Sequence, residues 1–280
     1  MSIRAWCCYT HLTRTDCVWR DADHSIKKFV DAIKGRAIQS YGHLEVFPGE
    51  PRQYFDETSS GDAIRWFGEM AADLVHSANF VRPVLVPFPN SLCTVRSITQ
   101  PTTLRLARAA AHFLDTIASD VLRFKSECRS SCRQGGTRDP NEIYRRLRLV
   151  GPVLNDRPYV LVDDVLASGG HARAGVAFLR ACGADVRLVV CAVSAEARRV
   201  ENPFARVVRR LSEFEPTSPS RQTSNPFVNF MLNPANGVDR DLTMLRELSS
   251  PFQPPDGRPR QAGACLDRRE PQEAERSGRG

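Results

Sequence analysis

The segment Tyr159–Ser194 constrains the fold of this chain more than any other part of the sequence. It begins with apolar residues typical of a buried strand, passes through two adjacent carboxylates and a Gly-Gly loop, and shows helical spacing from about His171 to Cys182. Gly183 has the position of a helix C-terminal glycine, and a second apolar run, Val186–Val193, follows at once. A strand, a helix and a second strand in this order form a βαβ unit, which predicts an α/β fold with a parallel sheet.

The loop between the first strand and the helix has the chemistry of a phosphate site. Gly169 and Gly170 permit positive φ and close approach of the backbone, and the amides of the first helical turn point outward without partners. The helix dipole adds partial positive charge, and the Ser168 hydroxyl is a further donor. Asp163 and Asp164, just before the loop, suit ribose hydroxyls or a magnesium ion. The sequence therefore predicts a phosphorylated sugar as ligand, bound with a metal.

The run VLVDDVLASGGH, from Val160 to His171, resembles the phosphoribosyl-pyrophosphate (PRPP) motif of type I phosphoribosyltransferases. In that motif a strand and two acids precede a Thr-Gly-Gly-Thr-like loop. The resemblance implies that Asp163 and Asp164 are the catalytic carboxylates, which hold the ribose hydroxyls and, through ribose or water, Mg²⁺. It also implies that the 5-phosphate is wrapped by Ala167, Ser168, Gly169, Gly170 and His171. An ordinary βαβ unit with a tight turn, or a phosphoacceptor or metal-binding α/β domain, is the alternative.

Three loop positions depart from the family pattern. Ser168 keeps the hydroxyl of the usual threonine. His171 keeps the backbone amide, and its ring either faces the phosphate as a cation or lies exposed at the start of the helix. Ala167 stands where purine-salvage members carry an acid that serves the base. Because alanine cannot transfer a proton, the resemblance disfavours a hypoxanthine- or guanine-type enzyme.

A second segment supports the same resemblance. VRPVLVPFP, from Val81 to Pro89, is an apolar strand followed by Asn90 and Ser91. It resembles the loop that holds pyrophosphate in this family and, more narrowly, the corresponding segment of the ComF-like phosphoribosyltransferases linked to DNA uptake. FVDAIKGR (29–36) and RQGGTRDPN (133–141) resemble other elements of that group, so that the matches together cover roughly residues 26–195.

Two features of the ComF-like group are missing. Cys7, Cys8 and Cys17 form no Cys-x-x-Cys pair, so they do not make the zinc ribbon with which that group often begins, and free thiols are expected instead. The Arg-Gly-Phe-Asn-Gln segment of the mobile catalytic loop is replaced by LCTVRSITQPTT after Ser91. Arg96 is the only base near this point that could reach pyrophosphate, and it completes the predicted pyrophosphate site.

The organisation along the chain follows from composition. We expect an N-terminal extension over residues 1–25, a phosphoribosyltransferase-type (Rossmann-like) domain over 26–211 and a low-complexity tail over 212–280. The tail is rich in Pro, Ser and charged residues, so it is expected to be disordered. Apolar spacing predicts further helices and strands. The helices are expected over 25–33, 63–78 and 104–122, the strands over 43–47 and 84–86, and a loop over 123–140.

Charge and cysteine content limit the classes of partner. No apolar run is long enough to cross a membrane, the first residues lack the apolar region of a signal peptide, and nine cysteines at irregular spacing do not suggest a disulfide framework, so a cytoplasmic location is expected. The net charge of +7 is modest for 280 residues and no nucleic-acid motif is present, so nucleic acid is not an expected partner. A protein partner for the tail and a homodimer are left open.

The resemblance implies a function in which PRPP and a nitrogenous base are the substrates. The 5-phosphoribosyl group would pass to the base with release of pyrophosphate, or the reverse, with Mg²⁺ as cofactor. The alternative is a non-catalytic module that binds PRPP or a nucleotide and serves regulation or DNA uptake.

Overall fold

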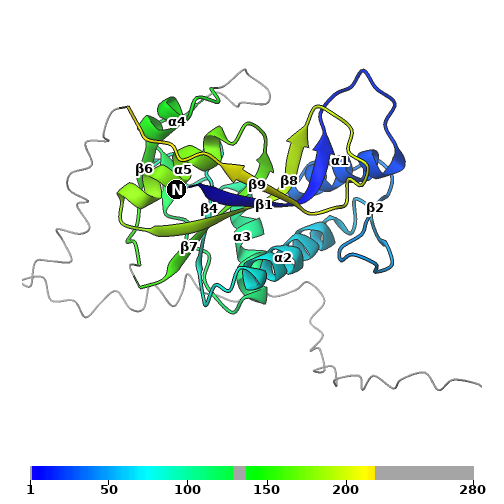
Figure 1. Ribbon diagram of the computed structural model, residues 1–280, viewed down its shortest axis with the longest axis horizontal. Coiled ribbons are helices and arrows are strands. Elements are labelled where there is room, and N and C mark those ends of the chain that lie inside the picture. The colour runs from blue at the N-terminus through cyan, green and yellow to red at the C-terminus, as the bar shows by residue number, and fades with distance from the viewer. Residues whose placement is uncertain (1, 129–136, 155, 218–280) are drawn as a thin grey trace, which may run out of the picture. The chain divides into compact units, whose positions relative to one another are not determined.

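The central element of the fold is a five-stranded, mainly parallel sheet with the strand order β4-β7-β8-β1-β9 (Figure 1). The structure is a computed structural model that describes residues 2–128, 137–154 and 156–217. The strands are β1 (Ile3–Leu12), β4 (Val84–Pro87), β7 (Pro158–Leu166), β8 (Asp185–Glu196) and β9 (Val207–Leu211). The first four run parallel to one another, and β9 is antiparallel to β1 at one edge. The predicted α/β fold with a parallel sheet is confirmed.

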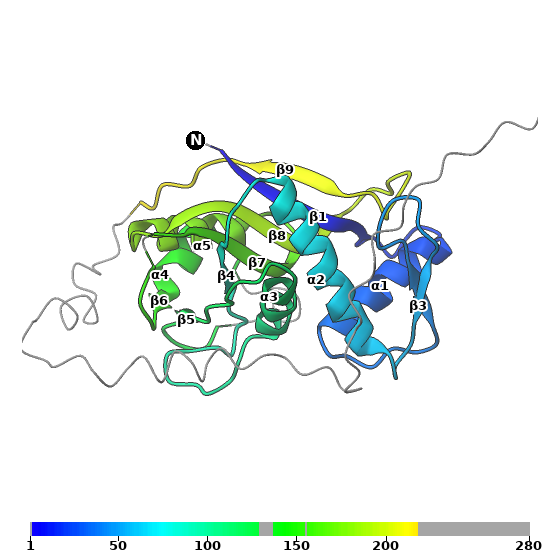
Figure 2. The ribbon, with the colours of Figure 1, turned by 90° about the horizontal axis from the view of Figure 1, so that it is seen from below.

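Helices cover both faces of this sheet. They are α1 (Asp21–Ile33), α2 (Ser60–Ser77), α3 (Thr102–Phe113), α4 (Pro140–Arg146) and α5 (Gly170–Ala181). Residues of α1, α2 and α3 share one apolar cluster with Val160 and Val162 of β7, whereas α4 and α5 share the other with Leu161. Alternate residues of a strand point to opposite faces, so the two clusters are the two sides of the sheet. In Figure 2, α4 and α5 lie to the left, and α1 and α2 lie to the right.

Two small antiparallel sheets of two strands each complete the described structure. One pairs β2 (Gly42–Leu44) with β3 (Gln53–Phe55), next to α1, and the other pairs β5 (Leu122–Phe124) with β6 (Leu147–Leu149). The strand that was expected over 43–47 therefore forms, one residue earlier and shorter. The helices predicted over 25–33 and 63–78 form as α1 and α2 and begin three or four residues earlier.

The N-terminal residues differ from the expectation. The sequence placed residues 1–25 outside the domain, but Ile3–Leu12 forms β1, which lies between β8 and β9 with Ala5, Cys7 and Cys8 fully buried. α1 also begins inside this range, at Asp21. β1 is buried because it pairs with β8, whose partner residues lie 184 positions later in the sequence. The local sequence pattern therefore did not predict this strand. The sheet of the domain therefore includes residue 3 onward.

The helix expected over 104–122 ends early. α3 stops at Phe113, and Asp115 takes a left-handed backbone with φ of 45°, which no helix can continue through. The chain then returns along β4, where Ala118 pairs with Leu85, and enters β5 at Leu122. β5 also means that the loop expected over 123–140 begins with strand residues.

β9, the last strand of the central sheet, ends at Leu211, where the sequence placed the end of the domain; the domain boundary itself stays a prediction. Residues 212–217 continue along the surface, where Glu213 pairs with Arg180 at 3.3 Å and the Phe214 ring meets Tyr144. The remaining tail, 218–280, lies outside the described residues, as do 133–136 of the segment that resembled the ComF-like group. None of the helices described is both long and apolar enough to cross a membrane.

We predict that Gly68→Ala loosens the packing of α2 on α3. A Cβ at Gly68 would lie 2.7 Å from the carbonyl carbon of Ala109, so one helix must move away. We expect a loss of about 1–3 kcal/mol in the free energy of unfolding, measured by urea denaturation. Gly61→Ala on the same helix is the control, because a Cβ there meets nothing within 4 Å and should stabilise by about 0.5–1 kcal/mol. Equal effects of the two changes would contradict the packing argument.

Candidate functional site

The carboxyl end of β7 places the two predicted aspartates on opposite faces of the sheet. Both residues lie inside the strand rather than after it, so their side chains alternate as those of any strand do. Asp163 follows Leu161 toward the α5 face, and Asp164 follows Val162 toward the α1 face. The sequence predicted two equivalent carboxylates, but the strand geometry makes them different.

Asp163 is a buried carboxyl group. Its relative exposure is 7 %, its register partner in β8 is Cys191, and its Oδ1 accepts a hydrogen bond of 2.8 Å from the backbone N–H of Asp164. Burial, together with the neighbouring charge of Asp164, raises the pKa of Asp163 well above its ordinary value. This side chain therefore keeps its proton to higher pH than an exposed aspartate would.

Asp164 is the carboxylate that reaches the surface of the site. Its side chain is 24 % exposed, and its Oδ2 lies 3.0 Å from the Lys34 Nζ. Lys34 caps the C-terminus of α1, where a cation is favoured by the helix dipole, and Gly35 follows with φ of 67°. Lys34 belongs to the segment 29–36 that resembled the ComF-like group, but sequence reasoning gave it no role. The Lys-Gly pair at the end of a helical pattern was the available signal.

The turn after β7 contains a glycine with the positive φ that the sequence allowed for. Gly169 caps the start of α5 in the left-handed conformation, with φ of 76°. A Cβ at Gly170 would collide with the carbonyl oxygen of Arg138, so both glycines are required where they stand. Ser168 is exposed, with its Oγ 3.4 Å from the Gly170 N–H. The loop thus places the exposed Ser168 hydroxyl and the first turn of α5 at the carboxyl edge of the sheet.

The two ends of this loop are held by side chains from other elements. The carbonyl oxygen of Ala167 accepts a hydrogen bond of 3.0 Å from the Arg209 Nη1 of β9. The His171 ring stacks on Phe88 with 5.0 Å between centroids. Burial lowers the pKa of His171, which favours the neutral ring. Of the two interpretations of His171, a cation facing the phosphate and an exposed residue, neither matches a half-buried ring packed against Phe88.

The predicted pyrophosphate residues follow β4, the strand next to β7. The Phe88 N–H donates to the Val162 carbonyl oxygen at 2.8 Å, which holds the segment after β4 beside β7. The Asn90 Oδ1 accepts from the Leu92 N–H at 3.0 Å, so this side chain shapes the turn. Because β4 and β7 are parallel, Asn90 and Ser91 lie at the same edge of the sheet as the loop after β7.

Arg96 lies farther along this segment and is exposed. Between it and β4, the carbonyl oxygen of Ser91 accepts from the Cys128 N–H at 3.2 Å, and Thr94 pairs with Phe124 of β5. The segment is therefore fixed to β5, with the Arg96 side chain in solvent. Nothing in these contacts assigns Arg96 to pyrophosphate, and that role stays a prediction.

A magnesium ion suits the residues only together with a phosphorylated ligand. Among the residues that the structure describes, no three His, Cys, Asp or Glu side chains come together as a metal site. Mg²⁺ in phosphate chemistry commonly uses one or two carboxylates, with phosphate oxygens and water as its other ligands. Asp164 is accessible for this purpose and Asp163 is buried. The donor set therefore fits a metal only in the company of a phosphorylated ligand.

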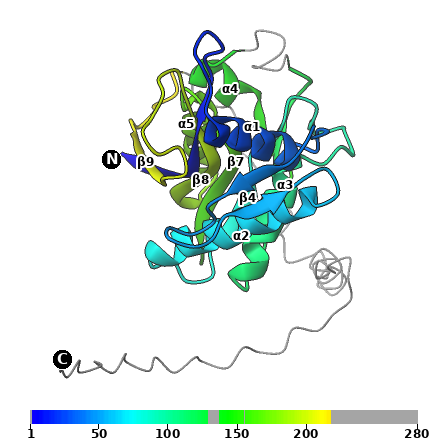
Figure 3. The ribbon, with the colours of Figure 1, turned by 90° about the vertical axis from the view of Figure 1, so that its right-hand side faces the viewer.

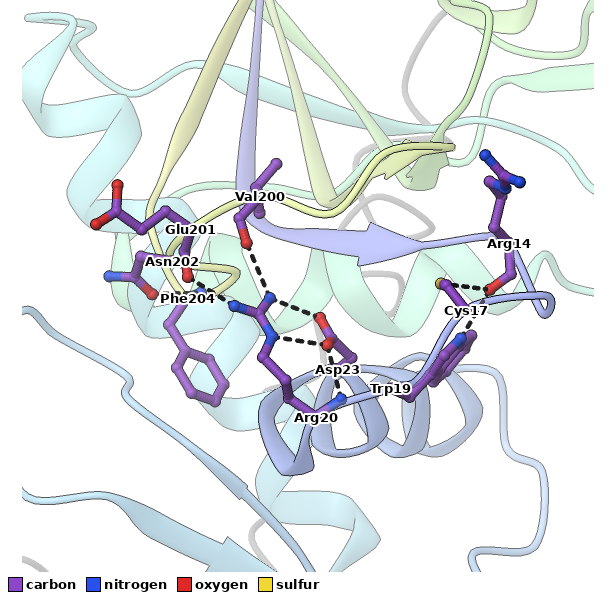
Figure 4. Close-up of polar contacts among 9 residues, drawn as sticks. All are labelled: Arg14, Cys17, Trp19, Arg20, Asp23, Val200, Glu201, Asn202 and Phe204. Carbon is purple, nitrogen blue, oxygen red and sulfur yellow. Dashed lines mark hydrogen bonds and ion pairs between the residues drawn. The ribbon is translucent and has the colours of Figure 1, made fainter.

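α1, which carries Lys34, is fixed at its other end by Arg20 (Figure 4). The Arg20 guanidinium binds the Asp23 carboxylate at 2.9 and 3.0 Å and donates to the carbonyl oxygens of Val200 and Glu201 at 2.8 and 2.9 Å. Burial alone would raise the pKa of Asp23, but the hydrogen bonds and charge of Arg20 outweigh it and lower the pKa. The start of α1 is thus tied to the chain that follows β8. In Figure 3, α1 lies in front of β7 and β8.

Comparisons with known proteins give structural similarity at low identity. No protein-family model matches the sequence, and no curated protein does. The structure is similar to adenine phosphoribosyltransferase from Trypanosoma brucei, with 15% identity over 77% of this chain and 95% of that chain and a TM-score of 0.34. It is also similar to adenine phosphoribosyltransferase from Thermoanaerobacter pseudethanolicus, at 17% identity over 59% and 87% of the two chains with a TM-score of 0.35.

A third similar structure is the UMP synthase of Leishmania donovani, at 11% identity, with a TM-score of 0.33. The match covers 64% of this chain and 32% of that longer chain. At these TM-scores the α/β fold rests on the strand order and pairing described above. These three structures do not bear on the narrower ComF-like resemblance, which stays a prediction.

We predict that Asp163→Asn becomes more stable relative to the wild type as pH rises. The folded protein keeps the Asp163 proton and the unfolded chain loses it above about pH 3.9, so the wild type loses stability from that pH up to its raised pKa. The loss is at most about 1.4 kcal/mol per pH unit, and the asparagine variant lacks it. Thermal unfolding from pH 4 to 7 in metal-free buffer measures the difference. Asp156→Asn, at an exposed position, is the control, and a constant difference for Asp163→Asn would contradict the prediction.

Proposed function

We propose that this chain binds PRPP at the carboxyl edge of β7 and transfers its 5-phosphoribosyl group to a nitrogenous base with release of pyrophosphate, or the reverse. One observation carries the proposal. Asp164 is accessible at the end of a central strand, and a left-handed glycine turn joins this strand to the N-terminus of a helix. A carboxylate and the N-terminal amides of a helix at one sheet edge suit a ribose that carries a 5-phosphate.

The proposed roles follow from the contacts of each group. The Ser168 hydroxyl and the amides from Gly169 to His171 bind the 5-phosphate, and Asp164 accepts hydrogen bonds from the ribose hydroxyls. Asn90 and Ser91 lie on the neighbouring strand end, where pyrophosphate would leave. A bound Mg²⁺ would neutralise pyrophosphate charge. Because the transition state has oxocarbenium character, positioning and charge stabilisation carry most of the catalysis.

Asp163 has a different part in this proposal from the one that the sequence suggested. As a buried group of raised pKa, it contributes through its hydrogen bond to the Asp164 N–H, which orients the next residue. Direct contact of its carboxylate with ribose would require it to leave the α5 face of the sheet. Asp164 is therefore the carboxylate of the pair that we assign to ribose.

The alternative is a module that binds PRPP or a nucleotide without turnover. Two observations favour it. Asp164 is already paired with Lys34, and LCTVRSITQPTT stands where the ComF-like group has its mobile catalytic loop. Three further ideas stay proposals: a ComF-like role in DNA uptake, a homodimer, and a protein partner for the tail. A screen for pyrophosphate release with different bases separates the enzyme from the module.

We predict that Asp164→Asn combined with Ser168→Ala weakens PRPP binding about 100-fold or more. Asp164→Asn replaces a charged acceptor by a neutral one, and Ser168→Ala removes a hydroxyl donor to the phosphate. A hydrogen bond to a charged group is worth about 1.5–3 kcal/mol, and 1.4 kcal/mol corresponds to tenfold in affinity. Isothermal titration calorimetry with PRPP, in the presence and absence of Mg²⁺, measures the effect.

Asp185→Asn is the matched control for this experiment, because Asp185 begins β8 at the opposite edge of the sheet and is exposed. It should leave PRPP affinity unchanged. Unchanged affinity in the Asp164/Ser168 variant would remove the site assignment. If the wild type binds neither PRPP nor ribose 5-phosphate nor a nucleoside monophosphate, the proposed function fails altogether.

A further inference from the structure

His11 of β1 lies in the same row of the sheet edge as the start of the proposed phosphate loop. Leu166, the last residue of β7, pairs with Ser194 of β8, and the next residue of β8, Ala195, pairs with His11. Ala167 follows Leu166 directly. The row across the carboxyl edge is therefore Ala167, Ala195 and His11, with adjacent strands about 4.8 Å apart.

The polar side of α1 faces both His11 and the accessible aspartate. Lys27, Asp31 and Lys34 recur at helical spacing and form one stripe of this helix. Lys27 pairs with Asp31 at 2.7 Å, and Lys34 pairs with Asp164 at 3.0 Å. His11 lies on the α1 side, because its ring meets Trp19, and the Trp19 ring meets His24 of α1 with 5.3 Å between centroids. The charges of Lys27 and Lys34 lower the pKa of His11 and that of Asp31 raises it. His11 and Asp164 thus border one polar region between α1 and the sheet edge.

The His11 ring is held in place, and one of its two nitrogens has no hydrogen-bond partner among the described residues. Its Nδ1 is buried and bonds to no residue that the structure describes. The ring meets Trp19 edge to face, with 6.1 Å between centroids. Trp19 is itself fixed, because its Nε1 donates to the Arg14 carbonyl oxygen at 2.7 Å (Figure 4). A buried ring nitrogen without a partner costs stability, which is expected where a group is kept for a ligand.

We propose that His11 is the group that accepts the ring N–H proton of the nitrogenous base, with Trp19 as an aromatic wall for that base. The inference rests on the proposed phosphoribosyl transfer. Ala167 cannot transfer a proton, and His11 supplies a proton acceptor in the same row. The substrate class is therefore a planar heterocycle with a ring N–H.

In the proposed step, one bond forms and one bond breaks at C1 of the ribose. The base nitrogen forms the bond to C1 of the ribose, and the bond from C1 to the pyrophosphate oxygen breaks, with its electron pair leaving on pyrophosphate. The N–H proton passes to the His11 imidazole and from there to water. No oxidant or further reactant is needed.

The charges around His11 favour the neutral ring that this step requires. Burial lowers the pKa of His11, Lys27 and Lys34 lower it further, and Asp31 and Asp23 oppose them. The net direction is below the ordinary value of about 6.5, so the imidazole is an acceptor at neutral pH. Activity should fall as pH drops through this lowered pKa.

The test compares His11→Gln with wild type in PRPP binding and in pyrophosphate release. We expect PRPP affinity within about twofold of wild type by calorimetry, since His11 serves the base alone. We expect kcat for pyrophosphate release, with the base that works best in a panel of purines, pyrimidines and aromatic amines, to fall about 10²–10⁴-fold. The acid limb of the kcat profile should disappear in the variant. His76→Gln, on the exposed side of α2, is the control.

Each outcome decides the inference. Full activity of His11→Gln, or a wild-type profile without an acid limb, overturns it and leaves the proposed function standing. PRPP binding by wild type without pyrophosphate release from any base also overturns it, in favour of the non-catalytic module. Failure of wild type to bind PRPP removes the proposed function itself. If His11→Gln does not fold, two other measurements test the inference. One is the wild-type pH profile. The other is Trp19→Phe, which should raise KM for the base and leave PRPP affinity unchanged.

Discussion

Strand β7 is hydrogen-bonded to β4 and β8 on its two edges and covered by helices on its two faces, and this enclosure determines the chemistry of the site. A strand in this position has room for charge only where the helix cover ends, at its carboxyl end. Asp163 lies one residue inside that limit and is buried with a raised pKa, whereas Asp164 lies at it and forms an ion pair. Two consecutive residues of one strand thus differ in role: the Asp163 carboxyl group accepts a backbone hydrogen bond, and the Asp164 carboxylate is accessible to a ligand.

α1 connects this edge to the rest of the domain at both of its ends. At the N-terminus, Arg20 binds the buried Asp23 and two carbonyl oxygens after β8. At the C-terminus, Lys34 reaches Asp164. A helix with both ends fixed keeps the polar stripe between them at a constant distance from the sheet edge. Catalytic and binding geometry depends on such support, because side chains on rigid elements hold their positions better than side chains on loops.

The sequence was sufficient for those parts of the structure that depend on neighbouring residues. The βαβ unit, the left-handed Gly169 and the helix that follows it arise within one short segment, so periodicity and turn chemistry predicted them. β1 was missed because it is defined by pairing with a strand far along the chain, and the end of α3 was missed because a left-handed Asp115 has no strong sequence signal. The same limit applies to Lys34 and His11, which reach the edge of the sheet only through tertiary packing.

Under the proposed function, the ion pair between Lys34 and Asp164 would favour an anionic ligand that also carries hydroxyls. Lys34 alone would attract any anion, and Asp164 alone would repel it. A ligand with phosphate groups near Lys34 and hydroxyls near Asp164 would pair its phosphate with the lysine and donate its hydroxyls to the aspartate. These two favourable interactions would offset the free energy lost when the ion pair separates. A simple phosphate ion satisfies only the lysine and leaves a half-buried carboxylate without a partner, which is costly. Under the proposed function, this charge arrangement would discriminate a phosphorylated sugar from a free anion before any contact with the base is made.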